Sequence, residues 1–125
     1  FNVRIYNTTK IEFPYNLIIG NFSVIGKRVK IKNHNILSIG SYCTISQDST
    51  LVDTTHDFNN KNFPLVFNKI KIEDNVWIAA ECFIGTKVEI CENVLLGARS
   101  VCVKDINEKG IYFGNPLRKK DSWIS

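Results

Sequence analysis

The sequence predicts an all-β fold in which short parallel strands coil around one axis, that is, a parallel β-helix. Three observations lead to this prediction. A large aliphatic residue returns every six positions along most of the 125 residues, a small residue usually follows it four positions later, and the interruptions of this repeat all leave from one face of the coil. A six-residue period is neither helical nor plainly alternating, and it is typical of strands that turn a corner every six residues.

The hexads cover most of the chain. Eleven of the twelve clear hexad starts are isoleucine or leucine, and a weaker pair, Ile5 and Ile11, precedes them in the same frame. The twelve starts are Ile19, Ile25, Ile31, Ile39, Ile45, Leu51, Ile72, Ile78, Ile84, Ile90, Leu96 and Cys102. Three hexads make one coil, and each coil is expected to rise by about 4.8 Å, the spacing between neighbouring strands.

Small residues complete the pattern. Four positions after a start the residue is usually small, as at Ser23, Cys43 and Ser100, and glycine often follows the start directly, as at Gly20 and Gly26. One large and one small side chain per face fill the interior of a narrow three-sided prism. Glycine permits close approach of the backbone at a corner. The pattern therefore predicts a triangular coil with a continuous apolar core.

Three insertions interrupt the hexads. Two extra residues lie in segment 11–19, two in segment 31–39 and fifteen in segment 51–72. When the hexads are assigned to the three faces in rotation, all three insertions leave from the same face. A repeat that tolerates insertions along one edge is usually building a site there, and both histidines, His34 and His56, lie in these segments.

The chain length predicts one domain. We expect a β-helix over residues 1–107 with a protruding loop at 57–71 after the fourth coil, and a C-terminal turn and tail over residues 108–125. Solenoids need capped ends, and Trp123 in the tail is expected to cap the last coil. Because the sequence contains no methionine, a processed or truncated chain stays an open alternative.

Composition excludes several classes of protein. No run of about 18 apolar residues is present, so no membrane span is expected, and no secretory signal peptide is recognisable at the start. The net charge is +4, but basic and aromatic residues do not interleave, so no nucleic acid partner is expected. The four cysteines form no CxxC pair. Most occupy inward positions, where free thiols act as small hydrophobes and indicate a reducing, cytoplasmic location.

Several local motifs are more specific than the repeat. They are "EFPYNLIIG" at 12–20, "THDFNNKNFPL" at 55–65, "IEDNVWIAA" at 72–80, "LLGARSVCVKDI" at 95–106 and "GNPLRK" at 114–119. With these motifs the chain resembles the hexapeptide-repeat acyltransferases, in particular the polysaccharide O-acetyltransferases of the colanic-acid type, which are related to the galactoside and maltose acetyltransferases. The resemblance implies a left-handed β-helix, a homotrimer with active sites between subunits, and acetyl-CoA as the acyl donor.

His56 is the candidate catalytic residue. Acyl transfer to a hydroxyl needs a base that takes the proton as the oxygen attacks the thioester carbonyl, and imidazole can do so at neutral pH. The resemblance implies this role for the histidine of the "THDF" motif, whereas an isolated loop histidine would ordinarily face solvent. Asp57 beside it is a candidate to orient the ring or to bind the acceptor.

Two further residues are candidates for contact with the acceptor. His34 lies in the insertion one coil before His56, where related galactoside enzymes hold a polar residue that contacts the acceptor; the alternative is an exposed bulge residue. Trp77 matches the family tryptophan near the reacting centre, and as an outward residue of a β-solenoid it is equally a candidate subunit contact.

Five residues are candidates for acetyl-CoA binding by the same resemblance. Ala80, Gly97 and Ala98 are expected to form a groove for the pantetheine arm, although small residues also suit a tight corner. Lys104 in "VKDI" and Arg118 after the Gly-Asn-Pro turn are candidates to pair with the phosphates of CoA. The alternative for both cations is an ordinary solvated side chain.

These features predict an acetyl-CoA-dependent O-acetyltransferase that modifies a hydroxyl of a sugar or polysaccharide precursor, with no metal. N-acetylation of an amino or nucleotide sugar and a non-catalytic scaffold stay open as alternatives. A γ-type carbonic anhydrase needs three histidine ligands, and the chain has two. An ice-binding protein would show regular threonine ladders in place of irregular charges. The loop at 57–71, with Phe58, Phe63 and Phe67, is expected to choose the acceptor.

Overall fold

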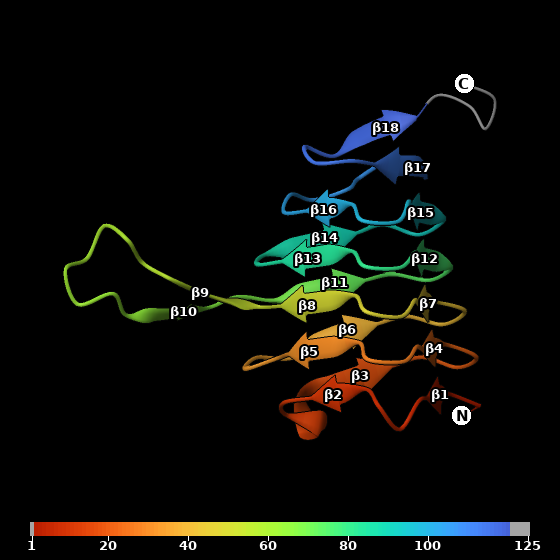
Figure 1. The fold of residues 1–125 in the computed structure, drawn as a ribbon, viewed down its shortest axis with the longest axis horizontal. Coiled ribbons are helices and arrows are strands. Elements are labelled where there is room, and N and C mark those ends of the chain that lie inside the picture. The colour runs from red at the N-terminus through yellow and green to blue at the C-terminus, as the bar shows by residue number, and fades with distance from the viewer. Residues whose placement is uncertain (1, 121–125) are drawn as a thin grey trace.

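The computed structural model describes residues 2–120, which form a stack of triangular coils with one long arm (Figure 1). Three sheets make the sides of the prism, and each coil contributes about one strand to each sheet. Sheet A contains β1 (Arg4–Ile5), β4 (Val24–Ile25), β7 (Thr44–Ile45), β12 (Val76–Ile78), β15 (Val94–Leu96), β17 (Gly110–Phe113) and β18 (Arg118–Lys120).

The other two sides are built in the same way. Sheet B contains β2 (Lys10–Ile11), β5 (Lys30–Lys32), β8 (Thr50–Val52), β13 (Phe83–Gly85) and β16 (Val101–Cys102). Sheet C contains β3 (Leu17–Ile19), β6 (Leu37–Ile39), β11 (Ile70–Ile72) and β14 (Val88–Ile90), and a short 3-10 helix, η1 (Pro14–Asn16), precedes β3. The arm is a separate hairpin of β9 (Thr54–His56) and β10 (Leu65–Phe67).

The coils wind in a left-handed sense, as the resemblance implied. With the N-terminus at the bottom of Figure 1, the near strands β5, β8 and β13 point to the left while the chain climbs. This is opposite to the right-handed crossover of ordinary parallel sheets. All pairing between coils is parallel except for β18, which folds back antiparallel onto β17. The predicted fold class is therefore confirmed.

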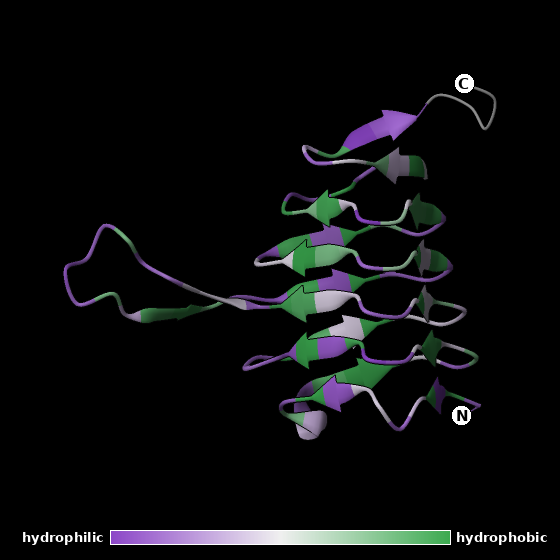
Figure 2. Ribbon diagram, in the orientation of Figure 1, coloured by the Kyte–Doolittle hydropathy of each residue, from purple (hydrophilic) through white to green (hydrophobic). Residues whose placement is uncertain are grey.

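The hexad starts form the core. Ile25, Ile45, Ile78 and Leu96 stand in register along sheet A, and each is fully buried. Figure 2 shows the resulting alternation of hydrophobic and hydrophilic residues along the strands. Because strand side chains point alternately to the two faces, one residue of each short strand enters the prism and its neighbours face outward.

The small inward residues also have a polar role. Ser23 Oγ donates to the carbonyl of Gly40 at 2.7 Å, and Ser49 Oγ donates to the carbonyl of Ala79 at 3.0 Å, in each case one coil further on. In each case a carbonyl group at a corner accepts a hydrogen bond from a serine hydroxyl, because buried polar groups need a partner. At Gly40 a Cβ atom would lie 2.8 Å from the backbone nitrogen of Asp74, so glycine is required for the coils to stack.

The structure corrects two boundaries predicted from the sequence. The long loop leaves the third coil, between β8 and β11, and not the fourth; hexads counted from Ile5 also place Leu51 in the third coil. The stack also continues past residue 107, since β17 pairs in parallel with β15. Trp123, the predicted cap, lies outside the described residues. Within residues 2–120 no helix is long and apolar enough to cross a membrane.

All three insertions emerge at the corner where sheet B passes to sheet C, as the face assignment predicted. The third insertion is the arm, which extends far from the stack on the left of Figure 1. Its strands pair His56 with Leu65 and Thr54 with Phe67, so these four side chains share one face of the ribbon. Leu65 and Phe67 are both exposed.

Candidate functional site

Asp53 anchors the base of the arm. It is fully buried at the corner that follows β8. Its carboxylate accepts hydrogen bonds from the backbone N–H groups of His34 at 3.0 Å and Asn35 at 2.8 Å, and from the Thr54 hydroxyl at 2.8 Å. Its carbonyl accepts from the N–H of Asn68, where the chain returns from the arm, at 2.8 Å. The residue therefore ties both ends of the arm to the preceding coil.

His56 lies at the end of β9, and its ring is oriented by the loop that follows. Its Nδ1 lies 2.8 Å from the carbonyl oxygen of Phe63. A carbonyl can only accept, so Nδ1 carries the proton in this contact and Nε2 keeps its lone pair in the neutral ring. The side chain is exposed. A positioned imidazole with a free Nε2 is the arrangement that a general base needs.

Of the two roles predicted for Asp57, the contact with the His56 ring is replaced by a contact with the loop backbone, and binding of the acceptor stays a prediction. Its carboxylate accepts from the N–H of Asn59 at 2.9 Å, which closes a tight turn at the start of the loop. Its own N–H donates to the carbonyl of Pro64 at 3.0 Å. The ring of His56 is oriented by the Phe63 carbonyl, and Asp57 shapes the loop that holds this carbonyl.

His34 packs under the arm, one coil below. Its ring lies against Phe13 and Phe67, with centroids 4.9 and 5.4 Å apart. Its Nδ1 is 3.0 Å from the Thr54 hydroxyl, and its Nε2 is 3.5 Å from a carboxylate oxygen of Glu12. Thr54 and His56 alternate with Thr55 on one strand, so His34 is beneath the face of the arm that carries His56. It is partly buried and is not an exposed bulge residue.

Trp77 is on a different side of the molecule. It points outward from β12 in sheet A, is 54% exposed, and donates from Nε1 to the Ser46 hydroxyl at 3.1 Å. Thr44, Leu95 and Ile111 continue the same outward row. In a three-sided prism the corner between sheets B and C is opposite sheet A. One chain therefore does not bring Trp77 and His56 together.

The residues expected to bind the cofactor are also divided. Ala80 and Ala98 occupy the corner between sheets A and B in successive coils, and Gly97 is beside Phe113 on sheet A. Lys104 is at the corner between sheets B and C, two coils above Asp53, and Arg118 is exposed on β18.

A hollow of about 300 Å³ lies near the C-terminal end of the stack. It is lined by Val101, Val103, Lys104, Tyr112, Pro116 and Leu117, among others. It includes the lysine predicted to meet CoA phosphates and the proline of the Gly-Asn-Pro turn. This hollow therefore joins two of the motifs that pointed to the cofactor.

The cysteines are poorly suited to be nucleophiles. Burial raises the pKa of the Cys102 thiol to about 11 and also raises the pKa of Cys43 and of Cys82. Since the thiolate is the reactive form, these groups stay protonated and inert near neutral pH. Within residues 2–120 no group of three or more histidine, cysteine, aspartate or glutamate side chains could hold a metal ion.

Sequence reasoning missed Asp53 and the Phe63 carbonyl. A signal for Asp53 did exist, because it occupies the same corner position, two residues after a hexad start, as the buried Asn33. A polar residue there can satisfy backbone groups that a corner leaves unpaired. No comparable signal exists for Phe63, since its carbonyl acts through the fold of the loop and not through the type of side chain.

Comparison with known proteins supports the resemblance. No family profile matches the chain. WcaF of Escherichia coli strain K12, named as a colanic acid biosynthesis acetyltransferase, is 30% identical over 115 residues, which are 92% of this chain and 63% of that protein. The galactoside O-acetyltransferase of the same strain is 30% identical over 113 residues, which are 86% of this chain and 56% of that protein. The chain thus spans less than two thirds of these relatives.

Solved structures show the same fold. A hexapeptide-repeat acetyltransferase from Vibrio cholerae, complexed with acetyl coenzyme A, superposes with a TM-score of 0.84 at 22% identity, covering 100% of this chain and 73% of that chain. An N-acyltransferase from Bacillus cereus, in complex with dTDP-4-amino-4,6-dideoxyglucose and coenzyme A, gives a TM-score of 0.84 at 23% identity, covering 95% and 69%. The resemblance predicted from the motifs is therefore confirmed: in fold and over most of its sequence, the chain is similar to the hexapeptide-repeat acetyltransferases.

Proposed function

We propose that the chain is an acetyl-CoA-dependent O-acetyltransferase that acts on a hydroxyl of a sugar or polysaccharide precursor, with His56 as the general base. The observation that carries the proposal is the hydrogen bond between His56 Nδ1 and the Phe63 carbonyl, which leaves Nε2 free at an exposed position. Two relatives at 30% identity, one named as an acetyltransferase and the other as a galactoside O-acetyltransferase, support the type of chemistry.

The reaction needs one proton acceptor that later becomes a donor. The acceptor oxygen attacks the thioester carbonyl carbon while His56 Nε2 takes the hydroxyl proton. The bond between carbon and sulfur breaks, and the imidazolium returns the proton to the sulfur. The products are an acetyl ester and the free thiol of CoA. At the end of the cycle the imidazole is neutral again, as it was at the start.

A second part of the proposal is that the working unit is a homotrimer with each site between two copies. His56 and Trp77 lie on opposite sides of one chain, so a site that contains both needs two copies. The arm presents Phe58, Phe63 and Val66 to solvent, an apolar surface of the kind that marks an interaction site. In this arrangement the pantetheine arm runs past Gly97 and Ala98, and Lys104 and Arg118 meet the phosphates.

A mixture of two defective subunits tests the shared site. His56→Ala and Trp77→Ala subunits, each nearly inactive alone, are expected to regain part of the activity when they are refolded together, because some interfaces then contain both native residues. Mixtures as inactive as their components would contradict a site shared between copies.

N-acylation of an amino sugar is the second candidate, favoured by the fold of the Bacillus cereus N-acyltransferase and its bound amino sugar. Parallel assays with hydroxyl and amine acceptors separate the two reactions. Free thiols at all four cysteines support the reducing, cytoplasmic location proposed for either reaction.

Calorimetric titration with acetyl-CoA is the first experiment, because it needs no knowledge of the acceptor. Micromolar binding, about −8 kcal/mol, is expected. A folded oligomer that does not bind acetyl-CoA would instead favour a scaffold, and the proposed reaction would be lost.

A further inference from the structure

The outer face of sheet B carries an unusual pair of like charges at its N-terminal end. Lys10 of β2 lies directly beside Lys30 of β5, and Thr50 of β8 follows in the same register. Like charges on directly opposite strand positions destabilise a sheet. This like-charge pair lowers the stability of the sheet, and a local loss of stability of this kind points to a function.

Neither lysine has a counter-ion among the described residues. Within residues 2–120, no carboxylate lies within ion-pair distance of Lys10 or Lys30. Two acids that line the same hollow as these lysines are already engaged. Asp48 holds Arg28 through two hydrogen bonds of 2.7 and 3.0 Å, and Glu81 holds Arg99 at 3.1 Å.

Arg28 is the main reason that the pKa of Asp48 is held below its ordinary value, with Lys30 as the smallest contribution. Asp48 therefore stays ionised and paired at neutral pH. The ammonium groups of Lys10 and Lys30, which form no ion pair in the part of the chain that the structure describes, can bind a ligand.

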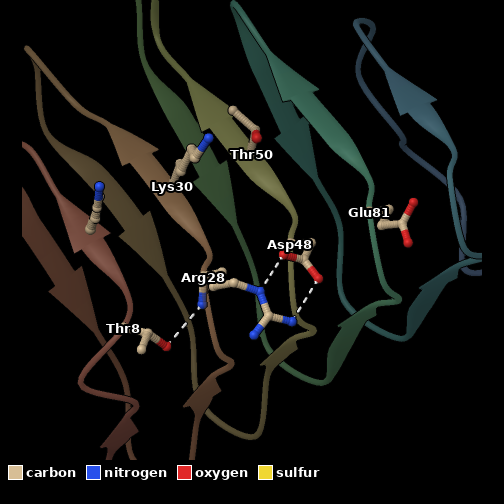
Figure 3. Close-up of a pocket in the computed structure, with 7 residues that line it drawn as sticks. Thr8, Arg28, Lys30, Asp48, Thr50 and Glu81 are labelled. Carbon is tan, nitrogen blue, oxygen red and sulfur yellow. Dashed lines mark hydrogen bonds and ion pairs between the residues drawn. The ribbon is translucent and has the colours of Figure 1, made fainter.

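A hollow of about 530 Å³ is lined by Lys10, Lys30, Thr50 and the Arg28–Asp48 pair, together with Thr8 and Glu81. Figure 3 shows Lys30 and Thr50 on one side of it and the Arg28–Asp48 pair on the other, with Thr8 and Glu81 toward its opposite ends. The Thr50 hydroxyl makes no hydrogen bond to the part of the chain that the structure describes. The hollow therefore offers two ammonium groups and a hydroxyl as donors, and carboxylate oxygens as acceptors for sugar hydroxyls.

The type of donor favours a carboxylate over a phosphate. Phosphate sites commonly use bidentate arginine or clusters of backbone N–H groups. Here Arg28 is occupied by Asp48, and the backbone N–H groups of Lys10, Lys30 and Thr50 are used between coils. The hollow instead has two lysine ammonium groups beside the Thr50 hydroxyl. This combination suits an acidic sugar, because its carboxylate can meet the ammonium groups while its hydroxyl groups meet Thr50.

One continuous segment of the chain, from β8 to β9, connects the hollow to the arm that carries His56. β8 begins at Thr50, turns the corner at Asp53 and continues as β9 to His56. His56 is six positions after Thr50, so the two lie no more than about 22 Å apart. A saccharide of several units can span this distance along the outside of sheet B.

We propose that this hollow is a subsite for a carboxylate-bearing sugar residue of the acceptor, which makes the acceptor an acidic saccharide chain. The inference rests on the proposed O-acetyltransferase function. Lys10 and Lys30 bind the carboxylate, Thr50 donates to the saccharide, and His56 acts on a hydroxyl several units away.

Direct binding tests the subsite without catalysis. Hexamers of galacturonate and of hyaluronan are titrated into the full chain without acetyl-CoA, beside neutral maltohexaose. At least one acidic hexamer is expected to bind, with affinity that falls as salt rises. Lys10→Gln/Lys30→Gln is expected to weaken this binding roughly tenfold, whereas Lys71→Gln/Lys109→Gln, with the same change of charge elsewhere, is expected to leave it unchanged.

Stability and charge rescue provide matched controls. The Lys10→Gln/Lys30→Gln variant is expected to unfold at the same temperature as the parent or higher, because a like-charge pair is removed. Lys10→Arg/Lys30→Arg is expected to retain most of the binding. A glutamine variant that unfolds at a lower temperature than the parent, or an arginine variant that also loses hexamer binding, would overturn the assignment.

Three results would overturn the subsite: no binding of either acidic hexamer, equal binding of maltohexaose, or displacement by inorganic phosphate far more effective than by chloride at equal ionic strength. The His56→Ala variant separates this inference from the proposed function, since it is expected to bind the hexamer normally while losing turnover. Lysine-dependent hexamer binding in a protein that does not bind acetyl-CoA would refute the reaction and leave the subsite standing.

Discussion

The stacked coils and the arm are both built from short strands, but the two regions differ in how their strands are paired and buried. In the coils, strands of two to four residues are held by neighbouring strands above and below, and an isoleucine such as Ile78 is fully buried. In the arm, two strands pair only with each other, and Phe58 at its tip is 79% exposed. We therefore expect the stack to supply most of the stability, and the arm to tolerate the exposed residues of the proposed site.

Removal of His56 is expected to give the largest effect, and it concerns activity alone. His56→Ala should lower kcat by roughly 10²–10⁴-fold, because a positioned base contributes about that much. The unfolding free energy should change by less than about 0.5 kcal/mol, as for other exposed positions. Steady-state kinetics and urea unfolding measure the two quantities. An unchanged kcat would remove His56 from the mechanism.

A matched pair of truncations compares the two regions directly. Ile78→Ala should lower the unfolding free energy by about 2–5 kcal/mol, because it leaves a cavity inside the prism. Phe58→Ala removes a larger side chain but should cost no more than about 0.5 kcal/mol in the single chain. Urea unfolding of both variants decides the point. Similar losses would mean that the arm packs against the stack.

The junction between the two regions depends on Asp53. In Asp53→Asn an amide NH₂ faces a backbone N–H of His34 or Asn35, and one buried donor is left unpaired. The expected cost is roughly 2 kcal/mol. Hydrogen exchange should become faster at these two amides and along β9, and slower turnover should follow because His56 is held less firmly. Protected amides in this variant would contradict the anchoring role.

The smallest effect concerns the stack alone and depends on pH. The native thiol of Cys102 has a pKa of about 11, against an ordinary value of 9.0. Between these values the native state keeps a proton that the unfolded state loses, so stability falls as the pH rises from 9 to 11. The loss is of the order of 2 kcal/mol. Cys102→Val should show a shallower decline than the parent in urea unfolding at pH 7, 9 and 10.5, and identical slopes would contradict it.

Much of the stack could be predicted because its information is local. The period of six places Ile25, Ile45, Ile78 and Leu96 in register whatever the rest of the chain does, and the predicted core positions are buried. The shared corner of the three insertions followed from counting residues. The coil from which the arm leaves was wrong by one, although hexads counted from Ile5 place Leu51 in the third coil.

The site was less predictable because it depends on contacts across coils. His56 was found through its motif, but the proton on its Nδ1 follows from the Phe63 carbonyl, seven residues away in a folded loop. Asp57 beside it was expected to orient the ring or to bind the acceptor; its carboxylate closes a turn, and acceptor binding stays a prediction. The separation of Trp77 from His56 follows from which sheet each one faces.

The sequence by itself determined the coil, its apolar core, the edge that carries the insertions and the candidate base. Each of these depends on residue type at a repeated spacing, and the physics of short strands acts within a few residues. Only the tertiary structure decided the orientation of His56, the anchoring by Asp53 and the juxtaposition of Lys10 with Lys30. These features arise from register between coils about twenty residues apart in sequence, where hydrogen bonds and like charges meet only after the chain has wound.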